Sequence, residues 1–243
     1  MSLPKIEVPR YKCVLPVSQI EVSYRPFLVG EQKTLLVAQE GDDNQNSVSE
    51  IIRLLQACTE GDVDLISLPA PDVEYLFIKI RVASVGETSK MQLSCNQEDC
   101  NEMTVVELEL DKVEIESDNN SNIVELTEGL SIELSPPNLF ELAKIEEKVQ
   151  QNSGIIVRGS EVSFQVLNKY ISKVINEDEI ITRDDFSDEE LDVFLEGLTL
   201  DMLDKISRYL EGQPKLVLNL NYQCSKCDKM IEQKLSGIQN FFG

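Results

Sequence analysis

The spacing of hydrophobic positions near the N-terminus predicts a β-hairpin. Ile20, Val22 and Tyr24 alternate with polar neighbours, as expected for a strand with one buried face. Residues 11–15 are also rich in strand formers, and residues 16–18 between the two segments favour a turn. We expect further strands at residues 91–95, 103–110, 122–126, 130–134, 215–222 and 230–235.

Apolar residues at helical spacing occupy much of the remaining chain. Ser47 is expected to cap one helix, with Glu50 as its capping-box partner, and Ser187 with Glu190 to do the same for another. Thr199 is a further expected cap. Residues 72–85 are rich in β-branched side chains, but the length of the segment favours a buried helix over a strand. The other expected helices cover residues 29–39, 137–149, 162–175, 184–198 and 200–210.

Two short turns between expected strands carry paired cysteines, Cys95 with Cys100 and Cys224 with Cys227. The fold class we predict is α+β: helical segments inserted between two cysteine-bearing β-hairpins, in a zinc-ribbon-like arrangement, plus the N-terminal β-hairpin. The expected regions are 1–86 (hairpin and helices), 87–135 (β region with the first cysteine pair), 136–213 (helical) and 214–243 (C-terminal hairpin packing on the first cysteine pair). A single composite domain is the alternative.

The cysteine spacings favour a structural metal site. Cys224 and Cys227 are separated by two residues and Cys95 and Cys100 by four, both within the range seen for zinc ligands. Four thiolates form a complete tetrahedral set, so we predict one structural zinc rather than a reaction centre. The alternatives are small apolar residues that bind no metal, the remnants of a lost site, and a disulfide or redox pair. Cys13 and Cys58 are expected to be ordinary core residues.

The charge and composition exclude several classes of function. The formal net charge is −22, from 44 acidic and 22 basic residues, whereas nucleic acids and anionic membranes bind basic surfaces. The charge fits a protein partner with basic patches; the alternative is that it only keeps the chain soluble. No histidine is present, which excludes Ser-His-Asp and Cys-His catalysis. With no Gly-rich phosphate loop either, we expect no enzyme and no small-molecule substrate.

Long apolar stretches are not found in this sequence. No apolar run approaches the roughly 20 residues that span a bilayer, and the N-terminus lacks the apolar stretch of a secretory signal. We therefore expect a cytosolic protein with reduced or metal-bound cysteines. No heptad pattern is sustained long enough to predict a coiled coil, and the oligomeric state stays open.

The two ends of the chain carry a recognisable pattern. The opening, VPRYKCVLPVSQIEVSYRPFLVGEQKTLLVA, combines a P-x-Y-x-C-x-L-P-x-S hairpin with a YRPF-x-V-x-E-x-K-x-LL-x-A segment, and the end combines a C-x-x-C turn, a strand and Phe241-Phe242. This pattern resembles the T4-like bacteriophage baseplate protein family. The matching residues at the N-terminus are Pro9, Tyr11, Leu15, Pro16, Ser18, Tyr24, Arg25, Pro26, Phe27, Val29, Glu31, Lys33, Leu35, Leu36 and Ala38.

The resemblance implies a role in the hub of a contractile-tail baseplate, either as a hub subunit or as a factor that catalyses hub assembly. It implies no chemical active site. Partners would be other phage tail and baseplate proteins, met in the host cytoplasm during assembly; a permanent subunit would stay in the virion. Arg25, Pro26 and Phe27 would pack the hairpin against the first helix or bind a partner. Phe241 and Phe242 would close the core or form a docking peptide.

Two other classes of function compete with this hypothesis. One is a zinc-ribbon regulator of transcription or replication, which would act through a polymerase because the acidic chain disfavours DNA contact. The other is an enzyme with thiol or carboxylate chemistry, which would need Cys224 in a cleft with a lowered pKa and no metal.

Overall fold

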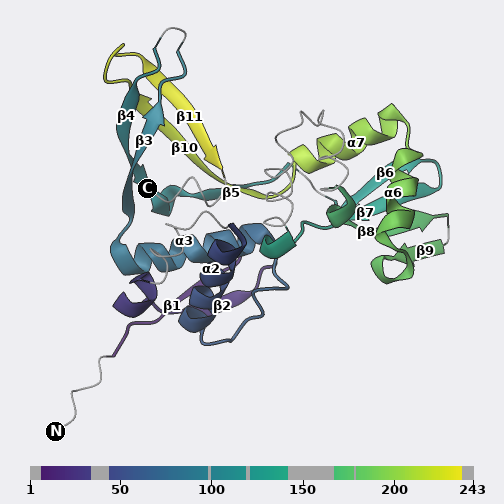
Figure 1. The fold of residues 1–243 in the computed structure, drawn as a ribbon, viewed down its shortest axis with the longest axis horizontal. Coiled ribbons are helices and arrows are strands. Elements are labelled where there is room, and N and C mark those ends of the chain that lie inside the picture. The colour runs from purple at the N-terminus through teal and green to yellow at the C-terminus, as the bar shows by residue number, and fades with distance from the viewer. Residues whose placement is uncertain are drawn as a thin grey trace. The chain divides into compact units, whose positions relative to one another are not determined.

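The computed structural model describes residues 7–33, 44–97, 100–118, 121–141, 167–177 and 179–236. The chain divides into two compact units. The first comprises residues 1–40, 50–116 and 215–243, and the second comprises residues 41–49 and 117–214. Both units contain helices and strands, which confirms the α+β class (Figure 1). No helix in the described ranges combines the length and apolar character needed to cross a membrane.

The N-terminal hairpin of the first unit is confirmed. β1 (Tyr11–Val14) pairs antiparallel with β2 (Glu21–Tyr24), and Tyr11 stacks on Tyr24 at a ring-centroid distance of 5.8 Å. A residue outside the hairpin binds the turn between the two strands. The Asp72 carboxylate accepts hydrogen bonds from the backbone N–H groups of Val17 and Ser18, both at 2.8 Å. The hairpin is therefore fixed to a residue more than fifty positions away.

Two helices follow in this unit. α2 (Asn44–Thr59) begins before Ser47, so the expected cap at Ser47 is wrong and that residue lies inside the helix. α3 (Ala70–Val85) confirms the choice of helix over strand for its β-branched sequence. Pro71 occupies its first turn, where a missing N–H costs nothing. Burial explains the apolar run, since α3 packs against β10 and its buried positions include Val73, Leu76, Phe77, Ile78 and Ile80.

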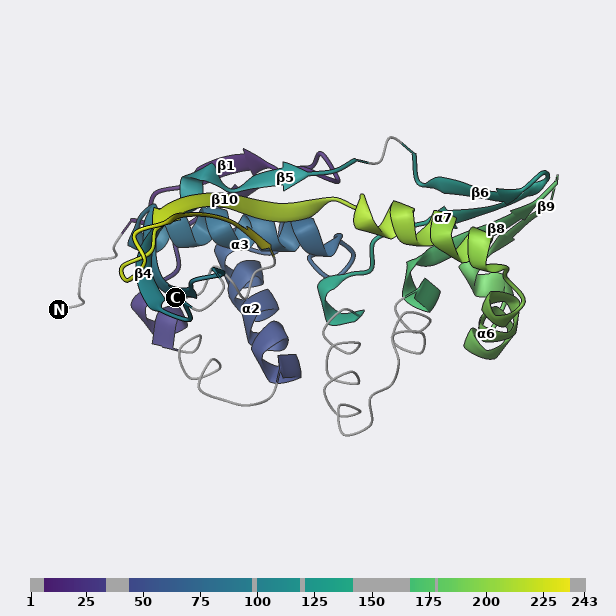
Figure 2. The same ribbon diagram turned by 90° about the horizontal axis from the view of Figure 1, so that it is seen from above.

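Both cysteine turns connect antiparallel strands. β3 (Thr88–Ser94) pairs with β4 (Met103–Glu109), and β10 (Lys215–Gln223) pairs with β11 (Met230–Ser236). The two hairpins lie side by side, with their turns at the same end (Figures 1 and 2). Their buried faces carry Leu93, Val106 and Leu108 on one hairpin and Leu218, Leu220, Ile231 and Leu235 on the other.

The short strand β5 (Glu114–Glu116) was not expected, because residues 115–121 are acidic and turn-rich. It follows the 3-10 helix η1 (Leu110–Lys112) and pairs antiparallel with β10, giving the strand order β11-β10-β5. Ile115 is opposite Leu216, which is fully buried. Because the partner strand is a hundred residues away, no local pattern indicates this pairing. The longer segment of the second unit, residues 117–214, begins directly after β5 and ends directly before β10.

The second unit contains a four-stranded antiparallel sheet of order β6-β7-β8-β9. β6 (Ile123–Thr127) and β7 (Leu130–Leu134) form the expected hairpin. β8 (Ile171–Asn176) overturns part of the expected helix over residues 162–175, and β9 (Glu179–Thr182) is a strand that was not expected. Residues 167–170 are helical, but pairing with β7 makes residues 171–176 a strand. Isoleucine and valine at 171, 174 and 175 suit that strand, so tertiary pairing decided the outcome.

Two helices cover one face of this sheet. α6 (Asp188–Glu196) follows the 3-10 helix η2 (Arg183–Asp185), and Ser187 with Glu190 forms the expected capping box. Thr199 caps α7 (Leu200–Glu211) as expected. The enclosed core consists of Val124, Leu126, Ile132, Leu134, Leu167, Ile171, Val174, Leu191, Leu195 and Ile206.

Some expected elements lie partly outside the described residues. Residues 29–33 are helical, and the remainder of the expected 29–39 helix is outside them. A helix begins at Leu139, where Asn138 and Glu141 exchange capping hydrogen bonds at 3.0 Å, and it is described as far as Glu141. Phe241 and Phe242 are outside the described residues.

Candidate functional site

The four cysteines of the two turns meet at one point. Their sulfur atoms all lie within 4.8 Å of one another. Cys95 Sγ is 3.8 Å from Cys227 Sγ, and Cys100 Sγ is 3.8 Å from Cys224 Sγ. A zinc–sulfur bond of about 2.3 Å places tetrahedral ligands about 3.8 Å apart, so these two distances have the value that a zinc ion requires.

Each cysteine turn is closed by backbone hydrogen bonds. Cys224 N–H donates to the Lys229 carbonyl at 3.0 Å, and Asp228 N–H donates to the Cys224 carbonyl at 3.1 Å. Asp228 has a φ of 56°, a left-handed conformation that aspartate tolerates better than most residues. In the other turn, Cys95 N–H donates to the Glu102 carbonyl at 2.9 Å. These bonds fix the directions in which the sulfur atoms point.

Backbone N–H groups also point at the sulfur atoms. Those of Cys227 and Lys226 donate to Cys224 and lower its pKa to about 6. At Cys95 the N–H of Gln97 acts in the same direction, but desolvation and the neighbouring thiols outweigh it and raise the pKa to about 12. Without a cation, four thiolates this close repel one another. A cation at the centre removes that repulsion.

Hydrogen bonds join the two hairpins beside the sulfur cluster. They run from Lys229 Nζ to Gln97 Oε1 at 3.1 Å, from Ser225 N–H to Thr104 Oγ1 at 3.2 Å, and from the Tyr222 hydroxyl to the Ser94 carbonyl at 3.2 Å. None of these three contacts between the hairpins was expected from the sequence. In the sequence these residues are marked only by their positions near a cysteine turn, and their hydrogen-bond partners lie more than a hundred residues away.

The donor set and its burial suit a structural metal. Cys95, Cys100 and Cys224 are buried and Cys227 is partly buried. Four protein ligands leave no coordination position for a substrate, which is the property that separates structural from catalytic zinc sites. All six cysteines of the chain are free thiols. The residue types, distances and N–H donors therefore fit a four-thiolate zinc site.

The remaining two cysteines lie away from the cluster. Cys58 is buried in α2, and Cys13 is partly buried on β1. Burial raises the pKa of each to about 11, which keeps both thiols protonated and poorly nucleophilic near neutral pH. Neither has the environment of a reactive cysteine.

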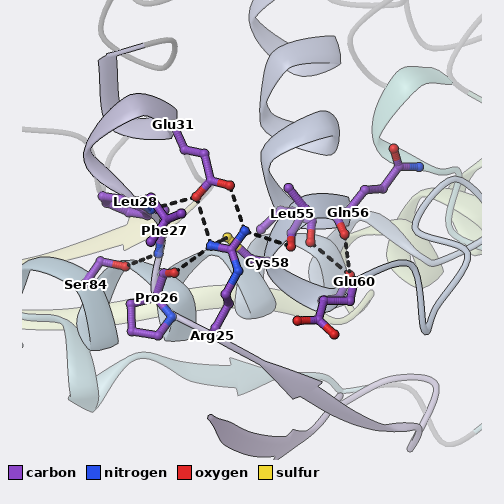
Figure 3. A network of polar contacts seen from close by, with 12 residues as sticks. Arg25, Pro26, Phe27, Leu28, Glu31, Leu55, Gln56, Cys58, Glu60 and Ser84 are labelled. Atoms are coloured by element: carbon purple, nitrogen blue, oxygen red, sulfur yellow. Dashed lines mark hydrogen bonds and ion pairs between the residues drawn. The ribbon is translucent and has the colours of Figure 1, made fainter. Parts of the chain in front are cut away.

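The N-terminal motif centres on Arg25, whose side chain binds three parts of the first unit (Figure 3). Its guanidinium makes a two-pronged pair with Glu31, at 2.9 Å to Oε2 and 2.7 Å to Oε1. It also donates to the Ala57 carbonyl at 3.0 Å, while the Arg25 backbone N–H donates to the Cys58 carbonyl at 3.0 Å. The hairpin, the helical residues around Glu31 and the end of α2 are thus joined.

Phe27 and Leu28 extend this network. Phe27 N–H donates to Ser84 Oγ on α3 at 3.0 Å, and Leu28 N–H donates to Glu31 Oε2 at 2.6 Å (Figure 3). The Arg25 hydrogen bonds lower the pKa of Glu31 below its ordinary value. These contacts account for Arg25, Pro26 and Phe27 as residues that hold the hairpin against the helices.

Comparison with known proteins identifies the family. No curated protein and no solved structure matches the chain. A family model described as "T4 bacteriophage base plate protein" matches residues 8–243, a range that includes the Arg25 network and both cysteine turns. The match supports the expected resemblance over nearly the whole length and gives no support to a transcription regulator. This chain belongs to the T4 bacteriophage base plate protein family.

Proposed function

We propose that this protein acts without enzymatic chemistry in assembly of the baseplate hub, by binding other tail proteins as an assembly factor or as a hub component. The observation that carries the proposal is the family match over residues 8–243. The absence of histidine supports the non-enzymatic part, because the commonest nucleophile and acid–base arrangements need it. The net charge of −22 favours protein partners with basic surfaces over nucleic acid.

The proposal includes one structural zinc held by Cys95, Cys100, Cys224 and Cys227. It is supported by the two 3.8 Å sulfur separations and by N–H groups directed at the sulfur atoms. The metal would join two hairpins of a zinc-ribbon-like element, whose cysteine pairs are separated by more than a hundred residues. When bound, zinc supplies cross-linking and charge neutralisation, and the protein residues supply a closed ligand shell.

Hub binding is tested with purified proteins. The full-length chain is mixed with each baseplate protein of the same phage in turn, and complexes are detected by size-exclusion chromatography with mass measurement. The expected result is a stable complex with at least one hub protein. Association with none of the hub or wedge proteins would contradict the proposal.

A second measurement separates the two forms of the proposal. Quantitative mass spectrometry of purified virions detects a permanent hub component at a fixed ratio to the other baseplate proteins. An assembly factor is present in infected cells but absent from the particle. The acidity of the chain favours the transient factor, because permanent interfaces are more apolar.

Metal binding is tested by native mass spectrometry of the intact chain. We expect one zinc per chain, lost in a Cys224→Ser, Cys227→Ser variant. Cys13→Ser is the matched control, since Cys13 lies outside the cluster, and it should retain the metal. A metal-free wild type with full stability would contradict the zinc site.

A further inference from the structure

Helix α6 presents an acidic and apolar face to solvent. Its inward positions Leu191 and Leu195 belong to the core of the second unit. On the outward side, Glu189, Val193 and Glu196 follow one another at intervals of four and three residues, which places them in one row along the helix. Val193 is 69% exposed between the two glutamates.

The two glutamates of this row differ from the other acids of α6. Asp188 pairs with Arg183 and Lys169, Glu190 completes the capping box, and Asp192 accepts a hydrogen bond from Asn168 at 3.0 Å. Within the part of the chain that the structure describes, the Glu189 and Glu196 side chains make no hydrogen bond or ion pair. Their charges are therefore available to an outside group.

A second exposed aliphatic residue follows α6 directly. Leu200, the first residue of α7, is 85% exposed, the highest value among the large hydrophobic residues described. Its position is fixed, because Thr199 caps the helix that Leu200 begins. Leucine at this site contributes little to the core, and its neighbour Asp201 adds a further exposed acid.

The sequence that includes α6 is rich in acidic residues. Between residues 177 and 204, twelve of 28 residues are acidic and one, Arg183, is basic. This segment carries a net charge of −11, which is half of the net charge of the whole chain. Such a field attracts basic groups and repels anionic partners, including nucleic acid and phospholipid surfaces. Exposed Val193 and Leu200 add apolar contact area that a purely solvating acidic surface does not need.

We propose that Glu189, Val193 and Glu196, here called the α6 face, bind a basic, apolar segment of a partner baseplate protein, with Leu200 as a further exposed apolar residue four positions along the chain. This inference rests on the proposed hub-assembly function and assigns it a surface. Glu189 and Glu196 are separated by seven residues, or about 10 Å along the helix. The partner segment therefore carries two basic side chains about 10 Å apart with an apolar side chain between them. Two turns of an amphipathic helix provide that spacing, with the basic and apolar side chains on one face.

The test uses the full-length protein and the purified hub protein that it binds, with affinity measured by calorimetry. Glu189→Lys with Glu196→Lys reverses both charges and should weaken binding by at least about tenfold. Val193→Ser removes the apolar contact and should also weaken binding. Because Val193 is exposed, this substitution should leave the fold intact, so weaker binding would result from the lost contact. The charge-matched control is Glu87→Lys with Glu107→Lys, two exposed acids of the first unit, and it should bind like the wild type.

Carbodiimide cross-linking locates the contact, because this reagent joins a carboxylate to a lysine that touches it. We expect Glu189 or Glu196 joined to a lysine of the partner. Wild-type affinity in the double reversal, or cross-links from these glutamates only to a second copy of this chain, would overturn the inference. If the wild type binds no hub protein at all, the proposed function itself fails, which is a distinguishable result.

Discussion

At the scale of single residues, buried polar side chains connect parts of the first unit that are distant in sequence. Asp72 is fully buried in the first turn of α3, where the helix N-terminus favours a negative charge. Its two carboxylate oxygens accept the N–H groups of Val17 and Ser18. A buried carboxylate is tolerated only when its oxygens are satisfied in this way. Asp72 therefore determines where the hairpin turn docks.

We predict that Asp72→Ala lowers the free energy of unfolding by about 2 kcal/mol, because it leaves two partly buried N–H groups without their acceptor. Urea denaturation followed by circular dichroism measures this change. The control is the exposed Asp62→Ala, which should change the free energy by less than about 0.5 kcal/mol. Equal effects of the two substitutions would show that Asp72 has no special anchoring role.

The Arg25–Glu31 pair predicts a specific dependence of stability on pH. Arg25 lowers the pKa of Glu31 from its ordinary value of 4.5, so the ionised glutamate stabilises the folded state. This contribution is fully present above pH 4.5 and is lost as the pH falls through the lowered folded-state pKa. We expect Glu31→Gln to cost about 1 kcal/mol near neutral pH and progressively less in acid.

The measurement is the difference in unfolding free energy between wild type and Glu31→Gln, taken from near-neutral pH down to acid. Glu21→Gln is the control, since Glu21 pairs with Lys12 on an exposed surface and should show a smaller difference. A difference for Glu31→Gln that stays constant with pH would rule out the ion pair as its cause.

At the scale of elements, helix ends in the second unit were predictable because capping is local. In the capping box of α6, Ser187 Oγ accepts from Glu190 N–H at 3.2 Å and Glu190 Oε2 accepts from Ser187 N–H at 2.8 Å. Both residues lie within four positions in the sequence. The same reasoning identified Thr199, whose hydroxyl accepts from Met202 N–H.

Ser187→Ala should therefore destabilise the second unit by about 1 kcal/mol, the usual cost of losing an N-cap side chain. Hydrogen exchange of the α6 amides measures the loss locally, and the free energy of unfolding measures it globally. Ser207→Ala, at an exposed position inside α7, is the control and should be neutral or slightly stabilising. If both variants behave alike, the cap contributes nothing measurable.

At the scale of the whole molecule, the proposed zinc belongs to one of the two compact units. All four cysteines are in the first unit, whereas the second has its own sheet, its own two helices and a separate core. Residues 117–214 of the second unit are inserted between β5 and β10, and the pairing of these two strands brings Glu116 opposite Lys215 at the two ends of the insertion. Each unit therefore has its own source of stability.

Removing the metal with a strong chelator should loosen the first unit and spare the second. We expect faster amide exchange in β3, β4, β10 and β11, because the metal cross-link between the two hairpins is lost. Exchange in β6 to β8 and α6 should stay unchanged. Cys224→Ser should reproduce the effect of the chelator. Equal loss of amide protection in both units, or no loss in either, would contradict the placement of the metal in the first unit.

The sequence by itself determined the elements whose causes are local. Alternation of apolar residues predicted the N-terminal hairpin, the turn at Glu128-Gly129 predicted the β6–β7 hairpin, and capping residues predicted where α6 and α7 begin. Cysteine spacing also indicated which four residues would form the candidate metal site. In each case the signal and the structure it specifies lie within a few residues of each other.

Only the tertiary structure decided the rest. β5 is a strand because β10 supplies its hydrogen-bond partners, and residues 171–176 are a strand because β7 does. The partners of Asp72 and Arg25, and the meeting of the two cysteine pairs, likewise depend on residues far along the chain. Pairing and burial between distant segments outweigh local propensity, which differs by only about 1 kcal/mol or less per residue.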